Sequence, residues 1–87
     1  MITLTQYGMM AEKHWREFCP QMVREMEAKG TLEGMLFEAQ EKTKDEMYDL
    51  TMQLRRQGAT AQQAHAQAWE MVRERYILRQ PEQSKPE

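Results

Sequence analysis

The chain has few residues that cross-link or break a polypeptide, and no long apolar run. Its 87 residues include one cysteine, three prolines and four glycines. The single thiol of Cys19 excludes an intrachain disulfide. No apolar run reaches the roughly 20 residues that cross a bilayer, and the N-terminus has no basic segment followed by an apolar core. These absences favour a cytoplasmic location and no membrane partner.

A strong excess of charge of one sign is also missing. Twelve basic and 14 acidic side chains leave a formal net charge of −2, which does not suit a general nucleic-acid binder. The two parts of the chain differ, however. Residues 1–50 carry six basic and ten acidic side chains, or −4, whereas residues 51–87 carry six basic and four acidic, or +2. A solvated helix face is the ordinary explanation for the arginines of the second part.

Aromatic residues are scarce, at 8% of the chain, whereas nine residues are methionine. A chain of this length forms one domain with a modest core. Methionine is flexible and polarizable, so a methionine-rich core is weakly specified and a methionine-rich surface adapts to partners. We therefore expect a protein partner or a homodimer.

Proline sets the first boundary between predicted helices. Pro20 suits the first turn of a helix and not its interior. The spacing of apolar residues predicts helices over 6–18 and 20–29, with Thr5 as the N-cap of the first. A single helix kinked at Pro20 is the alternative.

Glycine and threonine set the other two boundaries. Gly30 and Gly58 can close helices in the left-handed conformation. Thr31 and Thr60 follow them and can each cap the next helix through the hydroxyl oxygen. Gln63 completes a T-x-x-Q capping box with Thr60.

Between these marks the sequence predicts one long helix over 32–57. A helix of about 26 residues is about 39 Å long, more than a domain of this size needs, so it requires partners along its length from this chain or another. Its apolar side is a seam with steps of three and four residues, close to a heptad. The seam consists of Leu32, Leu36, Ala39, Thr43, Met47, Leu50 and Leu54.

The last predicted helix begins at Thr60 and has a face of small and apolar residues. We therefore expect an all-α fold of three to four helices around one long central helix. Residues 1–78 should form a single helical domain, and the polar, proline-containing residues 79–87 should form a disordered tail.

Residues for catalysis or metal binding are few. His14 and His65 are the only histidines, and with the single Cys19 they form no zinc-binding spacing. No third group is available to orient a thiol and its base, and no glycine-rich phosphate loop follows a strand. The sequence therefore predicts a protein that is not an enzyme, with no metal, no cofactor and no small-molecule substrate.

The turn at Gly58 permits a second interpretation, a small helix-turn-helix-like regulator that binds DNA. The helix after Gly58 is rich in amides, and glutamine can bind adenine in the major groove. Nearby arginines can contact phosphates. The candidate contacts are Arg55, Arg56, Gln62, Gln63 and Arg73.

Several markers in residues 7–60 occur in the same order in a known family. They are Tyr7-Gly8-x-Met10, Pro20, Gly30-x-Leu32, Leu36 and Gly58-x-Thr60. In this order the chain resembles the TnpV family of small transposon-encoded proteins. The resemblance implies a helical structure, a mobile-element or phage context, and no assigned chemistry or site residues.

The function predicted from the sequence is that of a non-enzymatic helical accessory or interaction protein. The resemblance implies that it comes from a bacterial mobile element or phage. Large aromatic side chains are the natural anchors of such an interface. The candidates for this surface are Trp15, Phe37, Tyr48 and Trp69. Burial of each ring in the core is the alternative, and for a large aromatic residue in a small helical domain it is the ordinary one.

Overall fold

The computed structural model describes residues 4–78, which form four helices and no strand. They are α1 (Gln6–Phe18), α2 (Pro20–Lys29), α3 (Leu32–Arg56) and α4 (Ala61–Tyr76). The predicted all-α fold with a long central helix is thereby confirmed. The tail expected over 79–87 lies outside the described residues.

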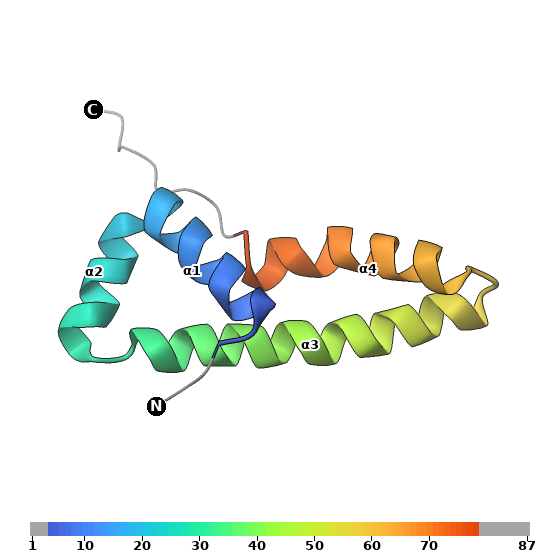
Figure 1. Cartoon of the computed structure of the whole chain (residues 1–87), viewed down its shortest axis with the longest axis horizontal. Helices are drawn as coiled ribbons and strands as arrows, with labels where there is room; N and C mark the ends of the chain where they lie inside the picture. Colours follow the sequence, from blue (N-terminus) through green and yellow to red (C-terminus); the bar gives the residue numbers. More distant parts are fainter. Residues whose placement is uncertain (1–3, 79–87) are drawn as a thin grey trace.

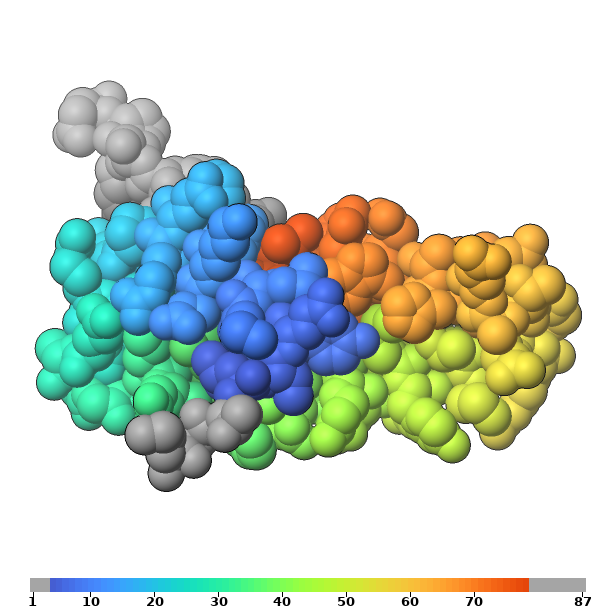
Figure 2. Space-filling model, in the orientation of Figure 1, coloured from blue at the N-terminus to red at the C-terminus, as the bar shows by residue number. Residues whose placement is uncertain are grey.

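Helix α3 is the long central helix, and α1, α2 and α4 all lie on one side of it (Figure 1). Helix α2 packs near the beginning of α3, and α4 runs back antiparallel along its second half. Helix α1 lies between α2 and α4, as the space-filling view shows (Figure 2). The Cα atoms extend only 14 Å along the shortest axis. The described helices α1, α2 and α4 therefore pack on the inner side of α3, and within residues 4–78 no helix lies on its other side.

The junctions between helices follow the predicted local chemistry at Pro20, Gly30, Gly58 and Thr60. Pro20 begins α2 in its first turn, so α1 and α2 are separate helices rather than one kinked helix. Gly30 adopts φ 73° and Gly58 adopts φ 109°, in the region that favours glycine. The Thr60 hydroxyl accepts from the Gln63 N–H at 3.1 Å, and the Gln63 side chain accepts from the Thr60 N–H at 3.1 Å.

Thr31 is the exception, and the prediction that it caps α3 through its side chain is wrong. Its hydroxyl donates to the carbonyl oxygen of Met26 at 3.4 Å instead of accepting from an N–H of α3. The left-handed Gly30 turns the chain so that the Thr31 N–H also bonds back to Met26, at 2.8 Å. Thr31 thus completes the end of α2. Thr5 precedes α1 in extended conformation, likewise with no side-chain cap bond.

The predicted seam of α3 faces the core for most of its length. Leu32, Leu36, Ala39, Thr43 and Met47 are buried, whereas Leu50 and Leu54 near the hairpin end are half-buried. A threonine fits this seam because its hydroxyl donates to the Ala39 carbonyl oxygen at 2.7 Å.

Trp15 connects α1 in the core to the residue that follows α4. Its side chain is 2% exposed, and its indole N–H donates to the carbonyl oxygen of Ile77 at 3.1 Å. This bond fixes the end of α4 against α1 across 62 residues of sequence. Leu36 packs in the same cluster, so α1, α3 and the end of α4 share one core.

Gly8 lets α1 approach α3 closely. A Cβ atom at this position would lie 2.5 Å from Oε1 of Gln40, closer than atoms can approach. Gln40 is buried, and the same oxygen accepts from the N–H of Thr5 at 2.5 Å. A buried glutamine on α3 therefore satisfies one of the N–H groups at the start of α1. No local feature of the sequence predicts this contact, because the two residues lie 35 positions apart.

Candidate interaction surface

The four aromatic residues predicted to form an interaction surface do not lie together. Trp15 is in the core, so its assignment to a surface was wrong: the indole is closed off by α3 and the end of α4. Trp69 is half-buried and stacks on Tyr7, with 5.5 Å between ring centroids. Phe37 and Tyr48 are 41% and 68% exposed. Only these two remain available on the surface of α3.

Phe37 and Tyr48 belong to one row of residues on the side of α3 opposite the core. We call this row the outer face. Apart from the adjacent pair Lys44 and Asp45, its members recur at steps of three and four, as the inner seam does, so they share one side of the helix. Lys44 and Asp45 straddle its middle. The outer face consists of Gly34, Phe37, Glu41, Lys44, Asp45, Tyr48, Met52 and Arg55.

Gly34 leaves an open, flat position on the outer face. Apart from its chain neighbours and the backbone of its own helix, no atom of the described residues lies within 4 Å of the place where its Cβ would be, and its φ is not positive. A glycine inside a helix costs about 0.5–1 kcal/mol relative to alanine. Among the described residues nothing packs against this position, so the packing of the fold does not explain the glycine.

A hollow of about 460 Å³ lies beside Tyr48. It is lined by Lys44, Asp45, Tyr48 and Asp49, all on α3. The middle of the outer face is therefore indented and bears charges of both signs. Such a surface can receive an amphipathic side chain that has an apolar stem and a charged end.

The charged groups of the outer face are partly organised within the chain. Lys44 forms an ion pair with Glu41 at 3.0 Å. Their hydrogen bond raises the pKa of Lys44 and lowers the pKa of Glu41. Towards the start of α3 the neighbouring charges are acidic, from Glu33 and Glu38, whereas Arg55 and Arg56 make its last turn basic. The face thus changes sign from one end to the other.

A second surface feature lies where α1 meets α3 and α4. It is a groove of about 470 Å³ whose floor includes the stacked rings of Tyr7 and Trp69. Met10 adds apolar surface, and Lys44 and His65 stand at its sides. Because Lys44 also lines the hollow beside Tyr48, the groove adjoins the outer face.

The predicted nucleic-acid contacts are only partly brought together. Arg55, Arg56 and Gln62 are exposed near the turn between α3 and α4. Gln63 lies there too, but its side-chain oxygen is engaged in the capping box. Arg73 lies about 16 Å further along α4 at 1.5 Å per residue, and pairs with Glu70 at 2.9 Å.

The geometry around Gly58 also differs from a helix-turn-helix motif. Helices α3 and α4 lie side by side and antiparallel, as an αα-hairpin (Figure 1). In a helix-turn-helix the second helix crosses the first steeply and projects into the groove. Here one side of α4 packs along α3, burying Ala64, Ala68 and Val72.

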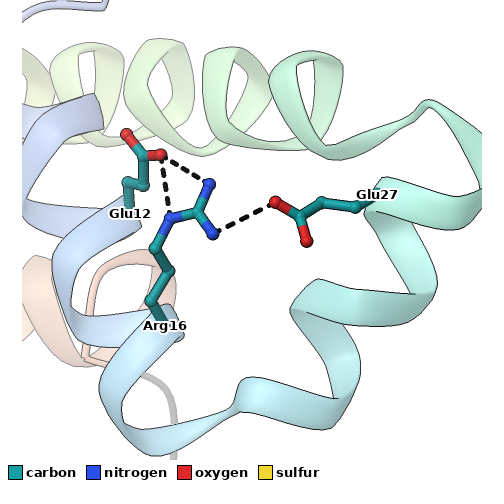
Figure 3. Close-up of polar contacts among 3 residues, drawn as sticks. All are labelled: Glu12, Arg16 and Glu27. Carbon is teal, nitrogen blue, oxygen red and sulfur yellow. Dashed lines mark hydrogen bonds and ion pairs between the residues drawn. The ribbon is translucent and has the colours of Figure 1, made fainter.

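Two ionic contacts between helices were not predicted from the sequence. Arg16 lies between Glu12 of its own helix and Glu27 of α2, at 2.9 and 3.1 Å (Figure 3). Hydrogen bonds to both carboxylates raise the pKa of Arg16. The pair with Glu12 has the i,i+4 spacing that the sequence could have revealed. The pair with Glu27 depends on how α2 turns back from α1.

The second contact ties α4 to α3. Glu46 accepts hydrogen bonds from the Tyr76 hydroxyl and from Arg75, the latter at 2.7 Å. The hydrogen bond from Tyr76, helped by Arg75, lowers the pKa of Glu46, and the same bond raises the pKa of Tyr76.

Within residues 4–78 no group of three or more His, Cys, Asp or Glu side chains is placed to hold a metal ion. Cys19 is buried at the junction of α1 and α2. The ring of His14 lies against that of Phe18, with centroids 4.6 Å apart. Over the same described range, no helix combines the length and the apolar character needed to cross a bilayer.

Residues 4–78 thus form a small all-α protein organised by α3. Comparisons with protein-family models, curated proteins and solved structures find no match.

Proposed function

We propose that this protein is a non-enzymatic accessory protein that acts by binding another protein chain through the outer face of α3. The exposure of Phe37 and Tyr48 carries this proposal, together with the position of the other helices of residues 4–78, which all lie on the opposite side of α3. Aromatic residues are enriched in protein interfaces because they offer a large apolar area at a low cost in side-chain entropy. Tyrosine also offers a hydroxyl that can bond to a partner.

The rest of α3 supports this proposal. The inner seam already holds the apolar residues that the core requires. The two aromatic rings of the outer face belong to neither core cluster of the described residues, and binding gives them a role. A location in the cytoplasm fits a protein with a single buried thiol. The mobile-element or phage context depends on the sequence resemblance alone.

Site-specific photo-crosslinking tests the proposal. A photoreactive phenylalanine analogue replaces Tyr48 in the cells that make the protein, and the same analogue replaces Met71 as a control. Met71 is 49% exposed and lies on α4. We expect position 48 to give a defined adduct heavier than the free chain and position 71 to give none. Equal labelling at the two positions, or no adduct at either, would count against the proposal.

Nucleic-acid binding at the hairpin turn is the second candidate function. The observation in its favour is that residues 50–69 contain Arg55 and Arg56 and no acidic residue. In residues 4–78 Arg16, Arg73 and Arg75 form ion pairs, whereas Arg55, Arg56 and the distant Arg24 of α2 do not. Arg55 and Arg56 are thus available to phosphates.

A gel-shift titration against duplex DNA tests this candidate. Binding should weaken steeply as salt rises, because released counterions drive phosphate contacts. Alanine at both arginines should reduce the slope of log K against log[salt] by about 2, since each phosphate contact contributes about one unit. Alanine at the exposed Lys13 of α1 should leave the slope unchanged. A duplex that does not shift at low salt would remove the candidate.

A further inference from the structure

We infer that the partner of the outer face is a second copy of this chain, packed antiparallel to the first about a two-fold axis that passes between Lys44 and Asp45. This inference rests on the proposed function and names its partner. It depends on the order of residues along α3, on the distribution of charge and on the open position at Gly34.

The outer face is symmetric in position about its own middle. In an antiparallel pair with two-fold symmetry, residue i of one copy faces residue j of the other and the reverse pair recurs. When the axis passes between residues 44 and 45, the two residue numbers of every pair add to the same value. Each position of the outer face then meets another position of the outer face. The pairs are Lys44 with Asp45, Glu41 with Tyr48, Phe37 with Met52, and Gly34 with Arg55.

The two central pairs are complementary in charge and hydrogen bonding. Lys44 and Asp45 have opposite charges, and the pair occurs twice about the axis. The Tyr48 hydroxyl can donate to the Glu41 carboxylate of the other copy. The hollow lined by Lys44, Asp45 and Tyr48 provides room for side chains of the second copy at this point.

The two outer pairs are complementary in shape. Methionine sulfur packs favourably on an aromatic ring, as Met52 would on Phe37. The open backbone at Gly34 leaves space for the long side chain of Arg55. This pairing gives the exposed glycine of α3 a role that the isolated chain does not.

Charge favours the antiparallel orientation over the parallel one. The first turns of α3 carry Glu33 and Glu38, and its last turn carries Arg55 and Arg56. An antiparallel pair places each acidic end beside the basic end of the other copy. A parallel pair would place like charges together and be repulsive.

Sedimentation of the full chain tests the inference, over about 1–200 µM so as to bracket a weak interface. We expect a monomer–dimer equilibrium that shifts towards the monomer as salt rises, because the central pairs are ionic. Lys44→Glu and Asp45→Lys should each weaken the dimer by about tenfold, because each places two repulsive pairs at the axis. Equal parts of the two variants should recover dimers, since each Glu or Asp then meets a Lys.

Matched controls separate these effects from changes in folding or total charge. Lys13→Glu on α1 and Glu74→Lys on α4 make the same charge changes at exposed positions away from the outer face. Neither should alter the dimer. Tyr48→Phe keeps the ring and removes only the hydroxyl, so it should weaken the dimer less than Tyr48→Ala does. Met71→Ala, an exposed truncation on α4, should have no effect. Helix content measured by circular dichroism establishes that each variant is folded.

Three results would overturn the inference: a wild-type chain that remains monomeric over this range, single charge reversals that leave the dimer intact, or a mixture that fails to recover dimers. If the wild type is monomeric while the photoreactive group at position 48 still forms an adduct with a different protein, the proposed function stands and only the identity of the partner is wrong. If neither occurs, both fail.

Discussion

The two sides of α3 have the same spacing of residues and different chemistry. The inner seam consists of aliphatic and small residues closed against α1 and α4, with Leu36 only 1% exposed. The outer face has the same three- and four-residue steps but consists of charged, aromatic and flexible residues. Apolar residues at helical spacing drive burial within one chain. The same spacing with ionic groups at its middle suits a contact that forms and dissociates.

The largest expected difference in unfolding free energy is between alanine substitutions at two adjacent residues, one on each side of α3. Leu36→Ala should cost about 2–5 kcal/mol of unfolding free energy, because it removes a fully buried side chain and leaves a cavity. Phe37→Ala, one residue further on, should change it by less than about 0.5 kcal/mol under monomeric conditions. Urea unfolding followed by circular dichroism measures both. Comparable losses at the two positions would remove the distinction between the sides of α3.

Two glycines inside helices provide the next test. Gly8→Ala should destabilise the fold by about 1–3 kcal/mol, because its Cβ would meet Gln40 and Leu4. Gly34→Ala should stabilise the monomer by about 0.5–1 kcal/mol, since alanine is the better helix former and nothing lies near the added methyl group. Thermal unfolding at low protein concentration should give shifts of opposite sign. A stabilising Gly8→Ala would mean that α1 lies further from α3.

Substitution of Leu50 tests how tightly the inner seam is packed near the hairpin end of α3. Leu50 is half-buried beside Met47 and Leu54 rather than enclosed. Leu50→Ala should therefore cost about 1–2 kcal/mol, less than Leu36→Ala, because water already reaches part of the site. The same urea titration gives the value. A cost equal to that of Leu36→Ala would show that the hairpin end is as tightly packed as the end near α1.

The smallest expected effect concerns pH and the contact between α3 and α4. The pKa of Glu46 is lowered in the folded protein, so its contribution to stability is present above the unfolded value of 4.5 and is lost as pH falls through the folded pKa. The pKa of Tyr76 is raised, so its contribution is present below 10.0 and is lost as pH rises through the folded pKa. Because Glu46 keeps 32% of its side chain exposed, the total should be under about 1 kcal/mol.

Unfolding free energies between pH 3 and 7 can isolate this contribution. Glu46→Gln should be less stable than the wild type near neutral pH and should show a smaller loss on acidification. Glu74→Gln, at an exposed position of α4, serves as the control. Parallel pH profiles for the wild type and Glu46→Gln would mean that the contact contributes nothing measurable.

The elements of the fold were predictable because local signals agree. Backbone geometry alone marks the start of a helix at Pro20 and the ends of helices at Gly30 and Gly58. The capping box at Thr60 can be recognised from four consecutive residues. Thr31 was misjudged because two local outcomes compete, and the turn at Gly30 directed its hydroxyl back to Met26. The chemistry of threonine permits either bond.

The candidate surface was less predictable than the helices. Trp15 and Trp69 have the same size and polarity as other interface anchors. Only the position of α4 buries Trp15, and only the position of α1 brings Tyr7 against the ring of Trp69. Gln40 is another example. An amide on α3 has no evident task until the start of α1 lies over it.

The sequence by itself determined where helices begin and end, and it placed one apolar seam along the long helix. Those features follow from interactions between residues at most a few positions apart. Only the tertiary structure decided which side of α3 is covered, because that depends on contacts such as Trp15 with Ile77, which are 62 residues apart. The long helix finds packing partners within the chain, and Phe37 and Tyr48 remain exposed on the side that the other helices of residues 4–78 do not cover.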